Sequence, residues 1–190
     1  VLKVISKFQK DSELCFKHVL GENNITLIQK NTMFHITMVD SDIAVTNVPD
    51  QEYVGDVNVR SSDLKDVVDT LELYTDTCVV TILKNKGQFI LSGKGVFGEG
   101  HRSFNLSSDC GKQSFITKTY TDFFPISFLS KFMKSYKLSK SVNVCMVENH
   151  PIMIHFPVSK QSYIRYYVAP KVPDDTDSSQ AMRFTDDIDD

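Results

Sequence analysis

A short amphipathic segment followed by residues of high β-sheet propensity recurs along this chain. The amphipathic segments occupy residues 2–10, 62–73 and 125–137, and they lie about 60 residues apart. Each one precedes stretches rich in Val, Ile, Thr and Phe. The repeating unit is therefore one helix followed by several strands. The repeat therefore predicts an α+β fold of helix-and-strand units.

The amphipathic segments have the helical period of 3.6 residues, and the first and third also carry a face of lysines. The predicted buried faces comprise Leu2, Ile5 and Phe8; Leu64, Val67, Val68 and Leu71; and Phe128, Leu129, Phe132 and Met133. The predicted basic faces comprise Lys3, Lys7 and Lys10 in the first helix and Lys131, Lys134 and Lys137 in the third. Ser61 or Ser62 is expected to cap the second helix, and Pro125 is expected to begin the third.

The residues between the predicted helices are typical of β-hairpins. Residues 78–83 and 88–92 flank Lys84-Asn85-Lys86-Gly87, while residues 142–147 and 152–156 flank the turn 148–151. Both turns contain residues that favour tight reversals, so the strands of each pair are expected to be antiparallel.

The sequence contains no pattern that is typical of a catalytic, metal or cofactor site. The four cysteines are Cys15, Cys78, Cys110 and Cys145, which are widely spaced and have no histidine at ligand spacing. Gly93-Lys94-Gly95-Val96-Phe97-Gly98 matches a dinucleotide motif, but a strand pattern follows it where a phosphate-binding helix is required. No apolar run could span a bilayer, and no signal peptide is recognisable. We therefore predict an intracellular protein without metal, cofactor or membrane partner.

Two short segments carry a resemblance to a known family. Val48-Pro49-Asp50-Gln51-Glu52-Tyr53 closes a polar linker, and Tyr166-Tyr167-Val168-Ala169-Pro170-Lys171 ends the strand-rich region. In this order and at this separation they resemble the proliferating cell nuclear antigen family of eukaryotic sliding clamps. The likeness extends from Leu2 to about Val172. The opening part of the family's first domain has no counterpart, so we expect the chain to begin inside a longer protein.

The resemblance implies a sliding-clamp fold, in which three subunits close a ring with helices lining the hole and sheets outside. It implies a subunit of a DNA sliding clamp, which is not an enzyme but acts as a polymerase processivity factor and as a scaffold for replication and repair proteins. The implied partners are encircled double-stranded DNA, bound regardless of sequence, DNA polymerase and other proteins with a clamp-binding motif, a clamp loader, and further copies of the chain in a trimer. The implied location is the nucleus, or a viral replication site if the source is a large DNA virus.

The resemblance and the composition together divide the chain into four parts. Residues 1–40 are expected to form the C-terminal part of a first clamp domain, and residues 41–52 an interdomain connector. Residues 53–172 are expected to form a second clamp domain. Residues 173–190, which are rich in Asp, are predicted to be a disordered acidic tail.

The two lysine faces form the predicted DNA-binding surface. The family's DNA-facing lysines correspond to Lys7, Lys10 and Lys134, and a chain of formal net charge −3 concentrates its positive charge on these helices. One departure concerns the second helix, where Asp66 and Asp69 occupy positions that are basic in the family. Because acids facing phosphates oppose binding, either this helix is rotated or DNA is held less symmetrically.

The resemblance implies two further surfaces. The partner-motif groove is expected to comprise Thr46, Val48, Pro49, Pro151, Tyr167, Ala169, Pro170 and Lys171. The subunit interface is expected to pair residues 30–37 of one copy with residues 99–105 of the next, with contacts from Phe34, Ile36, Arg102 and Phe104.

Three alternatives are compatible with the sequence. The chain could be a subunit of a checkpoint-type clamp, or an interaction protein that keeps the fold without a replicative role. In a different class, it could be an enzyme with an unrecognised active site around the glycine-rich residues 93–100.

Overall fold

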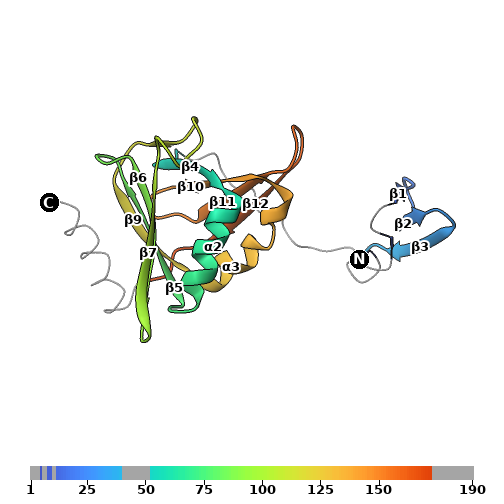
Figure 1. Cartoon of the computed structure of the whole chain (residues 1–190). Coiled ribbons are helices and arrows are strands. Elements are labelled where there is room, and N and C mark those ends of the chain that lie inside the picture. Colours follow the sequence, from blue (N-terminus) through green and yellow to red (C-terminus); the bar gives the residue numbers. More distant parts are fainter. Residues whose placement is uncertain (1–4, 6–7, 10–11, 40–51, 173–190) are drawn as a thin grey trace. The chain divides into compact units, whose positions relative to one another are not determined.

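The computed structural model describes residues 5, 8–9, 12–39 and 52–172 (Figure 1). The chain divides into two compact units, Val1–Pro49 and Asp50–Asp190. In the first unit, three antiparallel strands form one sheet in the order β1-β2-β3. These strands are β1 (Cys15–His18), β2 (Asn24–Gln29) and β3 (Thr32–Thr37). Most of the predicted first helix, including Leu2, Lys3, Lys7 and Lys10, lies outside the described residues, and Ile5 is helical.

The second unit contains two antiparallel sheets and two helices. One sheet has the order β12-β11-β10-β4-β8, and the other has the order β7-β6-β5-β9. Their strands are β4 (Gly55–Arg60), β5 (Thr77–Leu83), β6 (Gln88–Gly95), β7 (Gly98–Asn105), β8 (Phe115–Ile116), β9 (Tyr120–Pro125), β10 (Ser141–Met146), β11 (Ile152–Pro157) and β12 (Tyr163–Val168). The helices are α2 (Ser61–Glu72), α3 (Ile126–Met133) and the 3₁₀ helix η1 (Tyr136–Leu138).

Both sheets and both helices of the second unit contribute to one hydrophobic core. The core includes Val57, Leu64, Val80, Phe89, Phe124, Leu129, Met133, Val144, Ile154 and Phe156. Alternating strand residues and the i, i+4, i+7 stripe of α2 supply these side chains, as their periods of 2 and 3.6 require. Figure 1 shows α2 and α3 side by side, and contacts from Glu72 to Ser130 and from Lys65 to Tyr136 establish that they run antiparallel.

Both predicted hairpins are confirmed. Strand β5 pairs with β6, and β10 pairs with β11. Gly87 (φ +59°) and Asn149 (φ +59°) supply the left-handed backbone that the two turns need. The glycine motif at residues 93–98 ends β6 and opens β7, so it is a strand connection without a phosphate-binding helix. A side chain at Gly95 would collide with the carbonyl oxygen of Tyr74.

The structure corrects three expectations about the helices. The N-cap of α2 is Arg60 rather than Ser61 or Ser62, and no side chain caps the helix. The third helix does not run through residue 137, because i→i−3 bonds from Lys134 and Ser135 tighten the backbone after Met133 and lead into η1. Phe128 was predicted to be buried but is 48% exposed, since it lies on the same side of α3 as Lys131, whose amine is 5.1 Å from its ring centroid.

Candidate functional site

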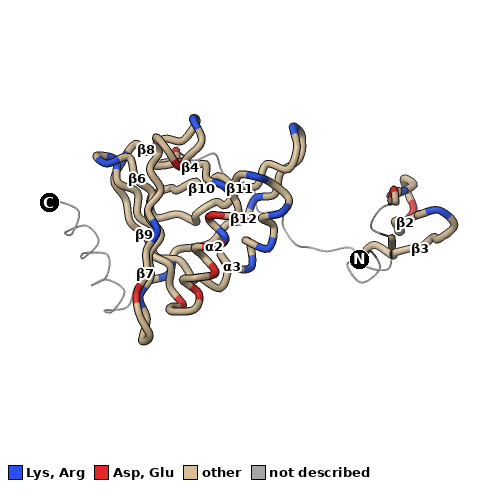
Figure 2. The backbone as a smooth tube through the Cα atoms, viewed as in Figure 1, with Lys and Arg blue, Asp and Glu red and all other residues tan. Residues whose placement is uncertain are grey.

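The lysines of α3 and η1 form an exposed basic row. Lys131, Lys134 and Lys137 are all exposed, at positions on α3, at its C-cap and on η1 respectively. Figure 2 shows blue segments gathered on and beside α3. Among the residues that the structure describes, none of the three makes an ion pair, so their charges remain available to an external anion. Their predicted partners Lys3, Lys7 and Lys10 lie outside the described residues.

The acids of α2 are partly neutralised. Asp69 pairs with Lys65, and that hydrogen bond raises the pKa of the lysine. Glu72 accepts a hydrogen bond from Ser130 of α3 at 2.7 Å. Asp63 and Asp66 instead line a recess between α2 and β7. The acids of α2 therefore fall into two groups: Asp69 and Glu72 bond to Lys65 and Ser130, while Asp63 and Asp66 line the recess next to β7, which Arg102 also lines.

Strand β7 is the edge of its sheet and borders the recess that Asp63 and Asp66 line. The recess has a volume of about 410 Å³, and besides Asp63 and Asp66 it is lined by Val67, Thr70, Leu71, Gly100, His101 and Arg102. Phe104 does not lie on this surface. Its side chain is 1% exposed and stacks on Phe89 at 5.8 Å in the core, because it points to the inner face of the sheet. Only its backbone could contribute to an interface.

In the first unit, β3 is likewise the edge of its sheet. Phe34 and Ile36 lie on this strand, and the Phe34 side chain is partly exposed. The ring of Phe34 meets that of Phe8 edge to face, with centroids 5.4 Å apart. An edge strand has backbone donors and acceptors without partners in its own sheet, which suits it to pairing with another copy.

The structure brings together the described part of the predicted groove. The pairing of Ile152 with Val168 places Pro151 next to Ala169 across the β11–β12 ladder. Tyr167 is 38% exposed. Thr46, Val48 and Pro49 lie outside the described residues, so the linker wall of the groove is not described.

The end of the C-terminal segment is docked on the other sheet. The backbone N–H of Lys171 donates to the carbonyl oxygen of Phe123 at 2.7 Å, and its amine donates to the Thr77 hydroxyl at 2.6 Å. The amine also lies 3.8 Å from Asp76. These contacts hold Pro170, which immediately precedes Lys171, in a defined position.

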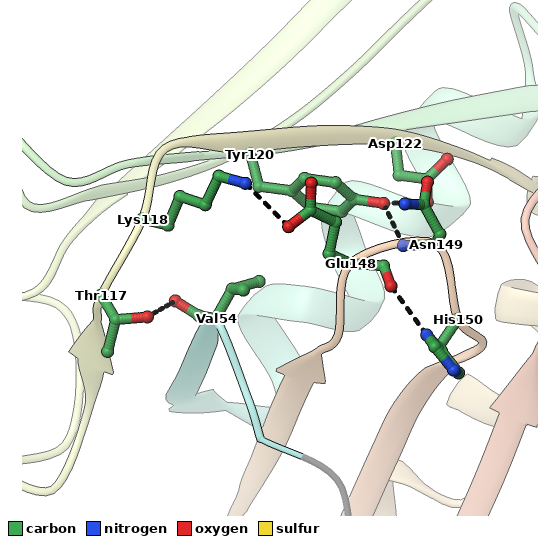
Figure 3. A network of polar contacts seen from close by, with 8 residues as sticks. All are labelled: Val54, Thr117, Lys118, Tyr120, Asp122, Glu148, Asn149 and His150. Atoms are coloured by element: carbon green, nitrogen blue, oxygen red, sulfur yellow. Dashed lines mark hydrogen bonds and ion pairs between the residues drawn. The ribbon is translucent and has the colours of Figure 1, made fainter.

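A polar network fixes the turn that carries Pro151 (Figure 3). The Tyr120 hydroxyl donates to Asp122 at 2.8 Å and accepts from the backbone N–H of Asn149 at 2.9 Å. Lys118 pairs with Glu148 at 2.7 Å, and the His150 ring contacts the Glu148 carbonyl oxygen at 2.7 Å. Burial, with a further contribution from the carboxylates of Asp122 and Glu148, raises the pKa of Tyr120 to about 12, so the phenol stays protonated.

Sequence reasoning missed this positioning role of Tyr120. The only available signal was Asn149 in the turn between two strands, because Asn tolerates a left-handed backbone. Nothing in the sequence pattern connects Tyr120 to a turn 29 residues away.

The described residues contain no cluster of three or more metal-ligating side chains. Burial raises the pKa of Cys78 to about 12 and that of Cys110 to about 11, which keeps both thiols protonated and unreactive. In the parts of the chain that the structure describes, no helix has the length and apolarity needed to cross a bilayer.

Comparison with known proteins identifies the family. The model of the proliferating cell nuclear antigen C-terminal domain matches residues 47–171. The chain belongs to the proliferating cell nuclear antigen family. Its relatives include the proliferating cell nuclear antigen of Caenorhabditis elegans, 25% identical over 145 residues that cover 74% of this chain and 54% of that protein. The proliferating cell nuclear antigen of Chaetomium thermophilum is 24% identical over 147 residues, covering 75% and 56%.

Membership of the proliferating cell nuclear antigen family accounts for the architecture. The matched range contains both sheets and both helices of the second unit, and the α+β arrangement is that of a sliding clamp. The identities near 25% make this chain a divergent member. The chain spans about half the length of the curated relatives it matches.

Proposed function

We propose that the protein is a subunit of a DNA sliding clamp that acts as a polymerase processivity factor and as a non-enzymatic scaffold for replication and repair proteins. The observation that carries this proposal is the exposed lysine row of α3 and η1, which makes no ion pair with any described residue, in a chain of the proliferating cell nuclear antigen family. A clamp must hold DNA without reading its sequence, and diffuse positive charge facing identical phosphates does this. The proposed location is the nucleus, or a viral replication site if the source is a large DNA virus.

The proposed ring is a homotrimer closed by strand edges. The outer edge of β3 in one copy pairs with the outer edge of β7 in the next, with Phe34, Ile36 and Arg102 near the junction. Pairing removes two edges that would otherwise be open to aggregation. The apolar part of the recess between α2 and β7, formed by Val67 and Leu71, can receive a side chain from the neighbouring copy.

The proposed domain organisation follows the two compact units. Residues 1–40 belong to a first clamp domain, residues 41–52 connect the domains, residues 53–172 form the second, and residues 173–190 are a tail. The division at Pro49 and Asp50 falls within the proposed connector.

The groove beside Pro151, Tyr167 and Pro170 is the proposed docking site for polymerases and other clients that carry a clamp-binding motif. Tyr167 offers partly exposed apolar surface, while the two prolines and the Tyr120 network keep the wall rigid. A rigid site loses less entropy when a peptide binds. A clamp loader, which must open the ring, is a further proposed partner.

Primer extension tests the processivity role. Polymerase from the same source, supplied with its clamp loader and a long primed template, should make longer products when the full-length protein is added under single-hit conditions. Tyr167→Ala should abolish the increase, whereas Tyr163→Ala on the same strand should preserve it. Products of equal length with and without the wild-type protein would contradict the proposal.

A further inference from the structure

The N-terminal end of α2 opens onto a basic recess. Its volume is about 320 Å³, and it is lined by Arg60, Ser61, Ser62, Tyr136, Lys137, Ser139 and Lys140. The recess is formed where the end of β4 meets the turn between η1 and β10, so residues far apart in the sequence meet there. The backbone N–H of Ser61 donates to the Lys140 carbonyl oxygen at 3.0 Å and joins the two segments.

Three cations line the recess and are not neutralised. Arg60, Lys137 and Lys140 are exposed and make no ion pair with any described residue. The amine of Lys137 lies 5.7 Å from the Tyr136 ring centroid, which positions it without cancelling its charge. Asp63 is the one acid in the first turn of α2. Asp63 lines the recess beside β7 and does not line this one, so the side chains that line this recess carry net positive charge.

The backbone of α2 adds polar groups that favour an anion. The helix has 12 residues and no side-chain cap. The amides of Ser62 and Asp63 lie in the first turn, where an α-helix offers no intrahelical acceptor. The aligned peptide dipoles also place partial positive charge at this end.

A buried hydroxyl independently points to a ligand. Ser61 is 1% exposed, lines the recess, and has no hydrogen-bond partner for its hydroxyl among the described residues. An unsatisfied buried hydroxyl destabilises a fold unless something else binds it. An oxygen-rich anion that accepts from this hydroxyl and from the nearby cations would satisfy it.

We propose that this recess binds a backbone phosphate of the encircled DNA. The inference rests on the proposed clamp function and extends the DNA surface beyond the lysines of α3. The row Lys131, Lys134 and Lys137 continues in sequence to Lys140, and the recess brings Arg60 close to Lys137 and Lys140. Where Asp66 and Asp69 replace the basic side chains of α2, the end of the same helix supplies the positive charge instead. A phosphate is the same at every step of the duplex, so such a contact permits sliding.

Titration of the full-length protein with inorganic phosphate tests the site itself. Amide resonances of Ser62 and Asp63 should shift and saturate in the wild-type protein. Ser61→Ala removes a hydroxyl that bonds to no described residue, so the variant should fold normally and bind phosphate about tenfold more weakly. Unshifted amides, or equal phosphate affinity in Ser61→Ala, would overturn the proposal.

Salt-dependent DNA binding then tests the source of the phosphate. Arg60→Ala and Lys140→Ala should each reduce the slope of log K against log salt by about one unit. Lys86→Ala, an equal charge change in the β5–β6 turn, serves as the matched control and should not change it. If Arg60→Ala and Lys140→Ala leave the slope unchanged while Lys134→Ala reduces it, the phosphate site is overturned and the proposed clamp function stands. Absence of DNA binding by the wild-type protein would overturn both.

Discussion

The phenolic oxygen of Tyr120 lies 2.9 Å from the backbone nitrogen of Asn149 and accepts its hydrogen bond. This contact connects the start of β9 to the turn between β10 and β11, across 29 positions in the sequence. Asn149 has a left-handed backbone and Pro151 follows two residues later, so the tyrosine holds the turn that leads into the proposed groove wall.

Tyr120→Phe should loosen this turn without disturbing the core. The variant loses the hydrogen bonds to Asn149 and Asp122, so the free energy of unfolding should fall by about 1 kcal/mol. Urea unfolding measures the loss. Hydrogen exchange at Asn149 should accelerate, and an unchanged exchange rate would mean that the tyrosine does not hold the turn.

A peptide with a clamp-binding motif, Gln followed by an aliphatic residue three positions on and then two aromatic residues, should bind the full-length protein at about micromolar strength. Tyr167→Ala and Pro170→Ala should each weaken binding, since a few buried apolar contacts dominate small interfaces. Thr46→Leu should strengthen it by restoring apolar volume. Tyr163→Ala, which removes a 57% exposed ring from the same strand, is the control. Calorimetry in which Tyr163→Ala and Tyr167→Ala behave alike would count against the groove.

Gly100→Leu should weaken trimer formation. The added Cβ would meet only Leu71, at 3.6 Å, so the subunit itself should fold normally. The side chain would fill the recess between α2 and β7 and obstruct a neighbouring copy. Phe34→Pro should have the same effect by removing a backbone donor from β3. Sedimentation should give a trimer for the wild type and smaller species for both variants. A wild type that is monomeric at micromolar concentration would refute the ring.

Stability should decline as the pH falls below about 6.5, in part because of His155. Burial, reinforced by the Arg165 guanidinium, lowers the pKa of His155 in the folded protein. The unfolded chain therefore binds this proton more readily, and folded-state stability is lost as the pH falls from the unfolded pKa toward the folded one. His155→Gln should show a flatter dependence in urea unfolding between pH 5 and 7.5. An equally steep curve would assign the effect to other groups.

The helix and strand periods in the sequence were sufficient to predict both hairpins and the buried stripe of α2, because those elements depend on local alternation. Two side chains show where the pattern fails. Phe104 alternates correctly within its strand, but its inward face became evident only once β7 was placed beside β6. Phe128 has the apolar character of a core residue, yet it packs beneath a lysine on the exposed side of α3.

The candidate site was predictable to the extent that a family motif marks it. Pro151 and Ala169 lie far apart in the sequence and meet through the register of β11 and β12. The Tyr120 network and the recess at Ser61 arise from contacts between distant segments and from a hydroxyl left without a partner. Neither leaves a periodic signal, so only three-dimensional packing reveals them.

Retention on end-blocked DNA tests encirclement most directly. The full-length protein is allowed to thread onto linear duplex DNA, both ends are then blocked with a bulky bound protein, and the complex is washed at high salt. A ring is topologically linked to the blocked DNA, so it should remain bound and should be released when a nuclease cuts between the blocks. Phe34→Pro, which should prevent ring closure, should wash off in both cases. Loss of the wild-type protein from blocked and open DNA at the same rate would contradict the account.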